Sequence, residues 1–168
     1  MVNPNILFER WFVQPLTKLH ELPNGDGGFV ALATSCFLYE RYAVATIEKS
    51  GGKANKEGKI RQFMSDFEVD EATARAFWDV IRDGILHEGM PITRKHGKGP
   101  LPDWAFLPIN RPVRMDKSNG SDILVVEPWL FTEKVLQLWK ENLPLIEQNK
   151  SFPWANVVRI VGRQEDQQ

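Results

Sequence analysis

The sequence has little cysteine, no excess of charge of one sign and no long apolar run. A single cysteine, Cys36, excludes an internal disulfide. The formal net charge of -1 at pH 7 gives no surplus of positive charge for duplex DNA or an anionic membrane surface. No apolar stretch reaches the roughly 20 residues that cross a bilayer, and the first residues lack the pattern of a secretory signal. We therefore expect a cytoplasmic protein that binds neither membranes nor duplex DNA.

Residues that commonly bind metals are also scarce. The three histidines, His20, His87 and His96, have neither the i,i+4 pairing nor the cysteine and carboxylate neighbours of a zinc site. Cys36 lies among apolar residues at helical spacing, where a free cysteine usually acts as a small buried hydrophobic residue. The sequence therefore predicts no bound metal and no cofactor.

The chain does contain enough apolar material for one core. Its 168 residues include six Trp and ten Phe, so we expect a single domain over residues 1–168, with a disordered tail at about 163–168. Proline is expected to break or kink the first predicted helix at Pro15 and to interrupt the last turn of the final one at Pro144. Helical spacing of apolar residues is found in the segments 4–14, 29–50, 60–67, 70–88 and 129–147.

Two segments between the predicted helices are expected to differ from them. Residues 53–59, KANKEGK, are typical of a solvated loop. Residues 91–127 form a proline-rich insertion that ends in a hairpin, because Asn119-Gly120 separates two apolar strands and sets Lys117 opposite Asp122. The predicted fold class is therefore mainly α, an antiparallel helical bundle with an inserted β-hairpin.

The end of the 70–88 helix carries the sequence Arg82-Asp83-Gly84-Ile85-Leu86-His87. This stretch resembles the R-x4-6-H signature of the HEPN superfamily, in which a polar residue commonly follows the arginine. A long helix before the motif and the position of the motif late in a later helix also resemble that family. The resemblance implies a HEPN-like bundle that forms a homodimer through the 70–88 helix. In active members it implies metal-independent endoribonuclease activity, in a toxin or defence component with an antitoxin as partner.

The residue types suit cleavage of RNA by internal attack of a 2'-hydroxyl. Histidine can accept or donate a proton near neutral pH, so His87 would act as general base or acid. Arg82 would hold the phosphate, because a guanidinium stays charged and can bind two phosphate oxygens. Asp83 would orient Arg82 or His87 through a hydrogen bond. The resemblance adds Glu40 and Arg41, on the earlier helix, to the same polar cleft.

Geometry sets a condition on this site. In an ideal α-helix, side chains five residues apart point about 140 degrees apart and lie about 7.5 Å apart along the axis. Arg82 and His87 can converge only if the helix loosens at His87 or if a twofold-related copy contributes the second group. Gly84 would allow close approach of helices at such an interface. Lys95 and Lys98, in the basic stretch 93–99, would steer RNA phosphates if they border the site.

The same residues also fit a non-catalytic protein. Arg82 and His87 near a helix C-terminus complement the helix dipole, which stabilises a helix by a few tenths to about 1 kcal/mol. The alternative function is therefore a helical module that binds a protein partner or a small ligand through its bundle or hairpin.

Overall fold

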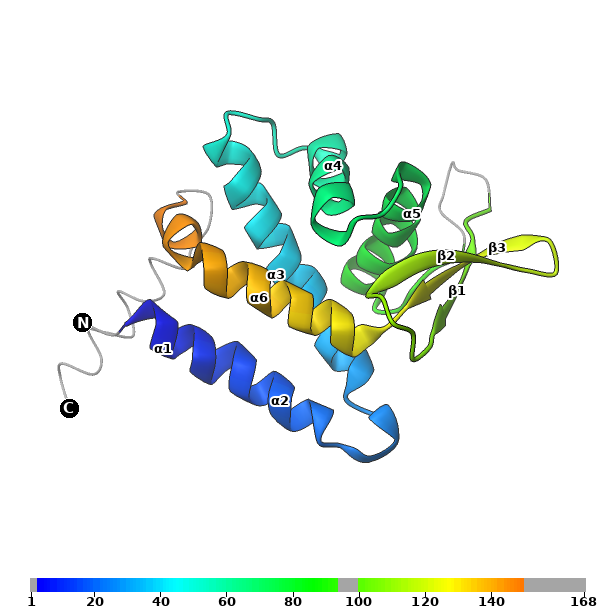
Figure 1. Ribbon diagram of the computed structural model, residues 1–168, viewed down its shortest axis with the longest axis horizontal. Helices are drawn as coiled ribbons and strands as arrows, with labels where there is room; N and C mark the ends of the chain where they lie inside the picture. The colour runs from blue at the N-terminus through cyan, green and yellow to red at the C-terminus, as the bar shows by residue number, and fades with distance from the viewer. Residues whose placement is uncertain (1–2, 94–99, 150–168) are drawn as a thin grey trace.

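The computed structural model describes residues 3–93 and 100–149, and the fold is mainly helical with a small three-stranded sheet (Figure 1). None of the helices in these residues is long and apolar enough to span a membrane. The α-helices are α1 (Pro4–Phe8), α2 (Gln14–His20), α3 (Gly28–Lys49), α4 (Lys56–Phe67), α5 (Glu71–Ala76) and α6 (Pro128–Gln148). The remaining elements are the 3₁₀ turn η2 (Pro23–Gly25), the π-helical segments η1 (Glu9–Val13), η3 (Phe77–Arg82) and η4 (Gly84–Glu88), and the strands β1 (Asp103–Phe106), β2 (Val113–Ser118) and β3 (Ser121–Val126).

Helices α3 and α6 form the centre of the molecule. Figure 1 shows α1 and α2 along one side of α6, with α4 and α5 on the other side. The indole N–H of Trp139 donates to the Leu38 carbonyl at 2.7 Å, and the buried hydroxyls of Ser35 and Thr132 lie 3.0 Å apart. These two contacts fix α6 against α3. The predicted long helix with a buried stripe, which includes Cys36, is confirmed as α3.

An aromatic cluster joins α3, α4, η3 and α6. The rings of Phe63 and Phe77 stack with their centres 4.6 Å apart, and those of Phe67 and Phe131 stack at 5.0 Å. Tyr39 meets Phe63 edge-on at 5.4 Å. All five side chains are buried. The cluster holds α4 and η3 against the α3–α6 pair.

The helix does not break at Pro15, one of the two outcomes expected there, and the interruption predicted at Pro144 is wrong. Pro15 lies at the start of α2, and the wide π-helical segment η1 precedes it without a break in the helix. A proline ring clashes with the carbonyl four residues earlier, and a π-helical turn relieves this crowding. Pro144 lies inside α6, which continues because Leu143 and Ile146, on either side of it, are buried in the core.

The predicted hairpin is confirmed as β2 and β3. Asn119 and Gly120 form its turn with positive φ angles of 52° and 81°, and Lys117 lies opposite Asp122 in the register. The sequence did not predict β1, which pairs in parallel with β3 to complete a sheet of order β1-β3-β2. The insertion is therefore a small sheet packed beside α5, and not only an irregular connection ending in a hairpin.

Candidate active site

Two consecutive π-helical segments, η3 and η4, carry the Arg82-to-His87 motif. The N–H of Asp83 donates to the carbonyl of Trp78, five residues back, where an α-helix would use the residue four back. The wider turn brings side chains five residues apart onto one face. Arg82 Nη1 lies 3.4 Å from His87 Nε2 within one chain. The helix thus loosens here, which was one of the two ways in which these groups could converge.

The chain after the motif accounts for the wide turn. The N–H of Ile92 donates to the Val80 carbonyl at 3.0 Å, so a backbone group from outside the helix uses this acceptor. A Cβ on Gly84 would lie 2.7 Å from the Met90 carbonyl oxygen and 2.9 Å from the Ile92 nitrogen. The close approach at Gly84 is therefore made by the chain's own residues 90–92. The expectation that Gly84 serves a helix of a second copy is wrong.

Arg82 is held by two carboxylates and an indole ring. Its Nη2 donates to Glu40 Oε2, and its Nη1 donates to Asp83 Oδ1 at 2.7 Å. The guanidinium carbon lies 5.5 Å from the centre of the Trp78 ring. The Arg82 side chain is only 15% exposed, and its buried Nε has no hydrogen-bond partner among the described residues. The guanidinium is therefore fixed in orientation.

Two lysines of α4 complete the site, and the sequence analysis missed them. Lys59 Nζ donates to Glu40 Oε1 at 2.7 Å, and Lys56 contacts both Asp79 and, at 3.5 Å, Asp83. Residues 56–59 are helical, because the Asn55 side chain caps α4, so the expected 53–59 loop ends at this cap. A signal was present in the spacing. Lys56 and Lys59 lie four residues before the buried Ile60 and Phe63, so both continue the apolar stripe of the helix.

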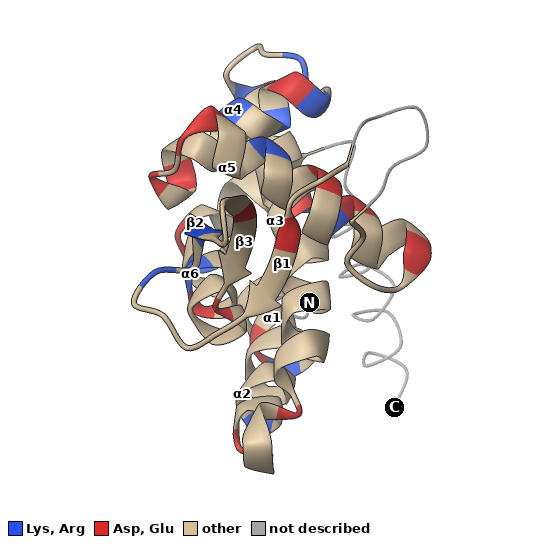
Figure 2. Ribbon diagram, turned by 90° about the vertical axis from the view of Figure 1, so that its right-hand side faces the viewer, with Lys and Arg blue, Asp and Glu red and all other residues tan. Residues whose placement is uncertain are grey.

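These six charged side chains form one network, which we call the charged network: Glu40, Lys56, Lys59, Asp79, Arg82 and Asp83. Within the part of the chain that the structure describes, its three cations balance its three carboxylates. Figure 2 shows basic and acidic segments mixed along α4 and α5. Burial raises the pKa of the Glu40 carboxyl, but the hydrogen bonds and positive charges of Lys59 and Arg82 outweigh burial and bring that pKa below its ordinary value. Glu40 is therefore an ionised partner of two cations.

The outer edge of the site is open and partly apolar. His87 is exposed, and so are its neighbours Leu86, at 36%, and Met90, at 53%. Arg41, one residue after Glu40, lies with its guanidinium carbon 5.5 Å from the centre of the Phe37 ring. Glu40, Asp83, Arg82 and His87 are thus brought together directly, whereas Arg41 stacks on the outer surface of α3. Lys95 and Lys98 lie outside the described residues.

The described residues contain no group of three or more histidine, cysteine or carboxylate side chains that could hold a metal ion. Burial raises the pKa of the Cys36 thiol far above its ordinary value, so this cysteine is a core residue and not a nucleophile. The chemistry available at this site is proton transfer by an imidazole beside a fixed guanidinium.

No family model, curated protein or solved structure matches the chain.

Proposed function

We propose that this protein is a metal-independent endoribonuclease of the HEPN type. One observation carries the proposal: η3 and η4 bring Arg82 and His87 to 3.4 Å of each other at an exposed edge of the molecule. A helix dipole can be complemented by either residue alone, so it does not require that the two lie side by side. Binding and cleavage at a phosphate do, because they need a cation and a proton carrier at adjacent positions.

The reaction assigns one role to each group. The His87 imidazole takes the proton of a ribose 2'-hydroxyl, and the 2'-oxygen then forms a bond to the adjacent phosphorus. The bond from phosphorus to the 5'-oxygen breaks, that oxygen takes a proton from water, and the His87 imidazolium returns its proton to the solvent. The products are a 2',3'-cyclic phosphate and a 5'-hydroxyl. Arg82 offsets the charge that develops on the phosphate oxygens, and Asp83 orients the guanidinium before the phosphate binds.

The apolar residues around the site support a homodimer through the 70–88 helix. Leu86 and Met90 flank His87, and Phe37, at 41% exposure, lies on α3 three residues before Glu40. Exposed apolar side chains grouped around a polar centre are typical of a protein interface. Wild-type protein is expected to run as a dimer in light-scattering chromatography, and Leu86→Asp is expected to shift it to a monomer. A toxin or defence role, with an antitoxin as partner, belongs to this proposal.

Cleavage of a fluorescent single-stranded RNA in the presence of EDTA tests the activity. The wild type is expected to cleave it, and His87→Asn or Arg82→Lys is expected to lower the rate by about 100-fold or more, the usual contribution of a positioned acid–base group. An oligonucleotide with 2'-deoxy sugars should resist cleavage. Full activity of both variants, or cleavage of the deoxy substrate, would contradict the mechanism.

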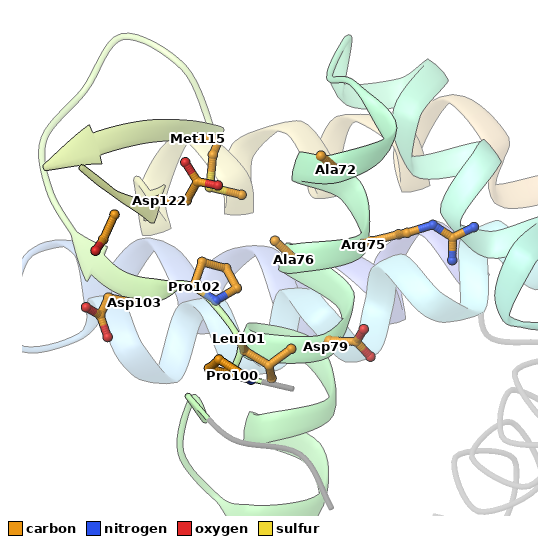
Figure 3. A pocket seen from close by; sticks show the side chains of 11 residues that line it. Ala72, Arg75, Ala76, Asp79, Pro100, Leu101, Pro102, Asp103, Met115 and Asp122 are labelled. Atoms are coloured by element: carbon orange, nitrogen blue, oxygen red, sulfur yellow. The ribbon is translucent and has the colours of Figure 1, made fainter. Parts of the chain in front are cut away.

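A second candidate is a non-catalytic module, and one feature favours it. A cavity of about 610 Å³ lies between α5 and the sheet (Figure 3). Its lining combines apolar side chains, among them Ala76 and Met115, with the charged side chains of Arg75, Asp79 and Asp122. Such a cavity can receive a small ligand or a partner's side chain. This function predicts that RNA remains intact with wild-type protein, and that Ala76→Trp abolishes binding of a partner identified by pull-down.

A further inference from the structure

Each carboxylate that holds Arg82 also contacts a lysine of α4. Glu40 accepts from Arg82 through Oε2 and from Lys59 through Oε1, at 2.7 Å. Asp83 accepts from Arg82 through Oδ1 and lies 3.5 Å from Lys56 Nζ through Oδ2. Every carboxylate bound to the arginine therefore has a second cation at its other oxygen.

This arrangement addresses a difficulty of the proposed site. Arg82 can bind a phosphate with its Nη atoms only if the hydrogen bonds to Glu40 and Asp83 weaken or break. A partly buried carboxylate that loses its only cation is strongly destabilised. The side chains of Glu40 and Asp83 are only 18% and 13% exposed, so water replaces the lost partner poorly.

Lys59 is built into the site and is not a mobile surface charge, whereas the Lys56 side chain is 35% exposed. The Lys59 side chain is 16% exposed, and its Nζ lies 5.5 Å from the centre of the Trp78 ring, the same distance as the Arg82 guanidinium carbon. Trp78 is itself buried. One indole therefore supports both cations, and Glu40 lies between them as their common partner.

We propose that Lys59 and Lys56 are positioning residues that retain Glu40 and Asp83 while Arg82 passes from these carboxylates to a phosphate of the substrate. The inference rests on the proposed function, because it takes an RNA phosphate as the natural ligand. The lysines themselves need not touch the phosphate. Their effect is to make the release of Arg82 less costly.

A double-mutant cycle with inorganic phosphate tests the proposal. Binding is followed by NMR through the Nε–H signal of Arg82 in the wild type, Lys59→Met, Glu40→Gln and the double variant. Lys59→Met is expected to weaken phosphate binding by about tenfold, because Glu40 must then be left without a cation. In the Glu40→Gln background the same substitution is expected to change binding less than about twofold, because a neutral amide needs no counter-charge.

Two controls separate this effect from simple charge and from misfolding. Lys53 is exposed, lies three residues before Lys56 and forms no ion pair among the described residues. Lys53→Met therefore removes the same charge near the site, and we expect it to change phosphate binding by no more than about twofold. Lys59→Arg should restore binding to within about threefold of wild type. A thermal unfolding curve for each variant establishes that the protein compared in the NMR experiment is folded.

Two outcomes overturn the inference. An equal loss in the wild-type and Glu40→Gln backgrounds would mean that Lys59 binds phosphate directly, and an unchanged Arg82 signal at saturating phosphate would mean that no transfer occurs. The nuclease proposal is judged separately by RNA cleavage. If the mutant cycle is non-additive but RNA is not cleaved, the exchange of Arg82 stands and the nuclease proposal is wrong. If RNA is cleaved but the cycle is additive, the nuclease proposal stands and the exchange of Arg82 is wrong.

Discussion

The aromatic cluster and the charged network are built on the same helices but differ in what they can exchange. Tyr39 and Glu40 are neighbours on α3, and Trp78 borders both regions, with its ring 6.4 Å from Tyr39 and 5.5 Å from the Arg82 guanidinium. Rings packed on rings lose contact energy when any partner leaves. Arg82, Glu40 and Asp83 each have two partners of opposite charge, so each can release one partner and keep the other. The aromatic cluster thus stabilises the fold, and the charged network contains the groups that can exchange partners.

Phe131→Ala should have the largest effect on stability. The ring stacks on Phe67 at 5.0 Å and on Phe77 at 4.9 Å, and it is fully buried, so its removal leaves a cavity among three helices. We expect a loss of about 3–5 kcal/mol in the free energy of unfolding, measured by urea denaturation. Phosphate binding by the protein that remains folded should be unchanged. A loss below about 1 kcal/mol would mean that the cluster does not dominate stability.

Gly84→Ala should have an intermediate effect and should damage the site as well. Alanine favours a helix over glycine by about 1 kcal/mol. The added Cβ, however, would lie within 3 Å of the backbone of Met90 and Ile92. Backbone atoms cannot move aside easily, so we expect a net loss of about 1–3 kcal/mol in unfolding free energy. The shift of residues 90–92 should also break the Ile92–Val80 hydrogen bond and separate Arg82 from His87.

Gly89→Ala provides the matched comparison. Gly89 has a φ of 75° at the end of the same helix, and a Cβ there meets nothing within 4 Å. The expected loss is about 1 kcal/mol, from backbone conformation alone, without loss of RNA cleavage. Nuclear Overhauser contacts between the Arg82 and His87 side chains report on the site in both variants. A Gly84→Ala protein that is more stable than wild type would show that the contact with residues 90–92 is not formed.

The aromatic cluster could be predicted from the sequence more fully than the charged network. Phe63, Phe67 and Phe77 lie on apolar stripes at helical spacing, and burial follows from that pattern. The Arg82-to-His87 motif was visible in the sequence, but the close approach of the Arg82 and His87 side chains was not. The wide turn depends on a hydrogen bond from Ile92, a residue in the proline-rich connection, and spacing within one helix does not reveal such a contact.

The α4 lysines and strand β1 were missed for different reasons. A lysine-rich stretch after two glycines is typical of a loop, and only the Asn55 cap marks Lys56 as the first helical residue. Strand β1 has four residues, and its parallel partner lies some twenty residues later, so no local alternation or turn identifies it. The α4 lysines thus had local signals, the cap and the apolar spacing, whereas only a tertiary contact identifies β1.

The smallest effect concerns two carboxyls with opposite pKa shifts. Glu40 has a pKa lowered by its cations, despite burial. Burial raises the pKa of the Asp66 carboxyl, and its hydrogen bonds from Tyr39, Gln62 and Tyr42 and the charge of Lys134 do not fully offset this. Ionised Glu40 therefore stabilises the folded protein at pH values above the pKa that Glu40 has in the unfolded chain. This stabilisation is lost as the pH falls through the lower pKa that Glu40 has in the folded protein. Asp66 acts in the opposite sense, because its contribution is lost as pH rises through its folded pKa.

The two substitutions should therefore change acid unfolding in opposite directions, in the range of roughly pH 3 to 5 where carboxyls titrate. Glu40→Gln is expected to lower stability at pH 7 by about 1 kcal/mol and to make the acid loss of stability shallower. Asp66→Asn keeps an acceptor for the Tyr39 hydroxyl and should change stability at pH 7 by less than about 0.5 kcal/mol. The loss of stability at low pH should be steeper in Asp66→Asn than in the wild type, because the Asp66 carboxyl that opposes this loss is gone. Chemical denaturation at several pH values measures both slopes, and parallel slopes would mean that Glu40 and Asp66 have equivalent environments.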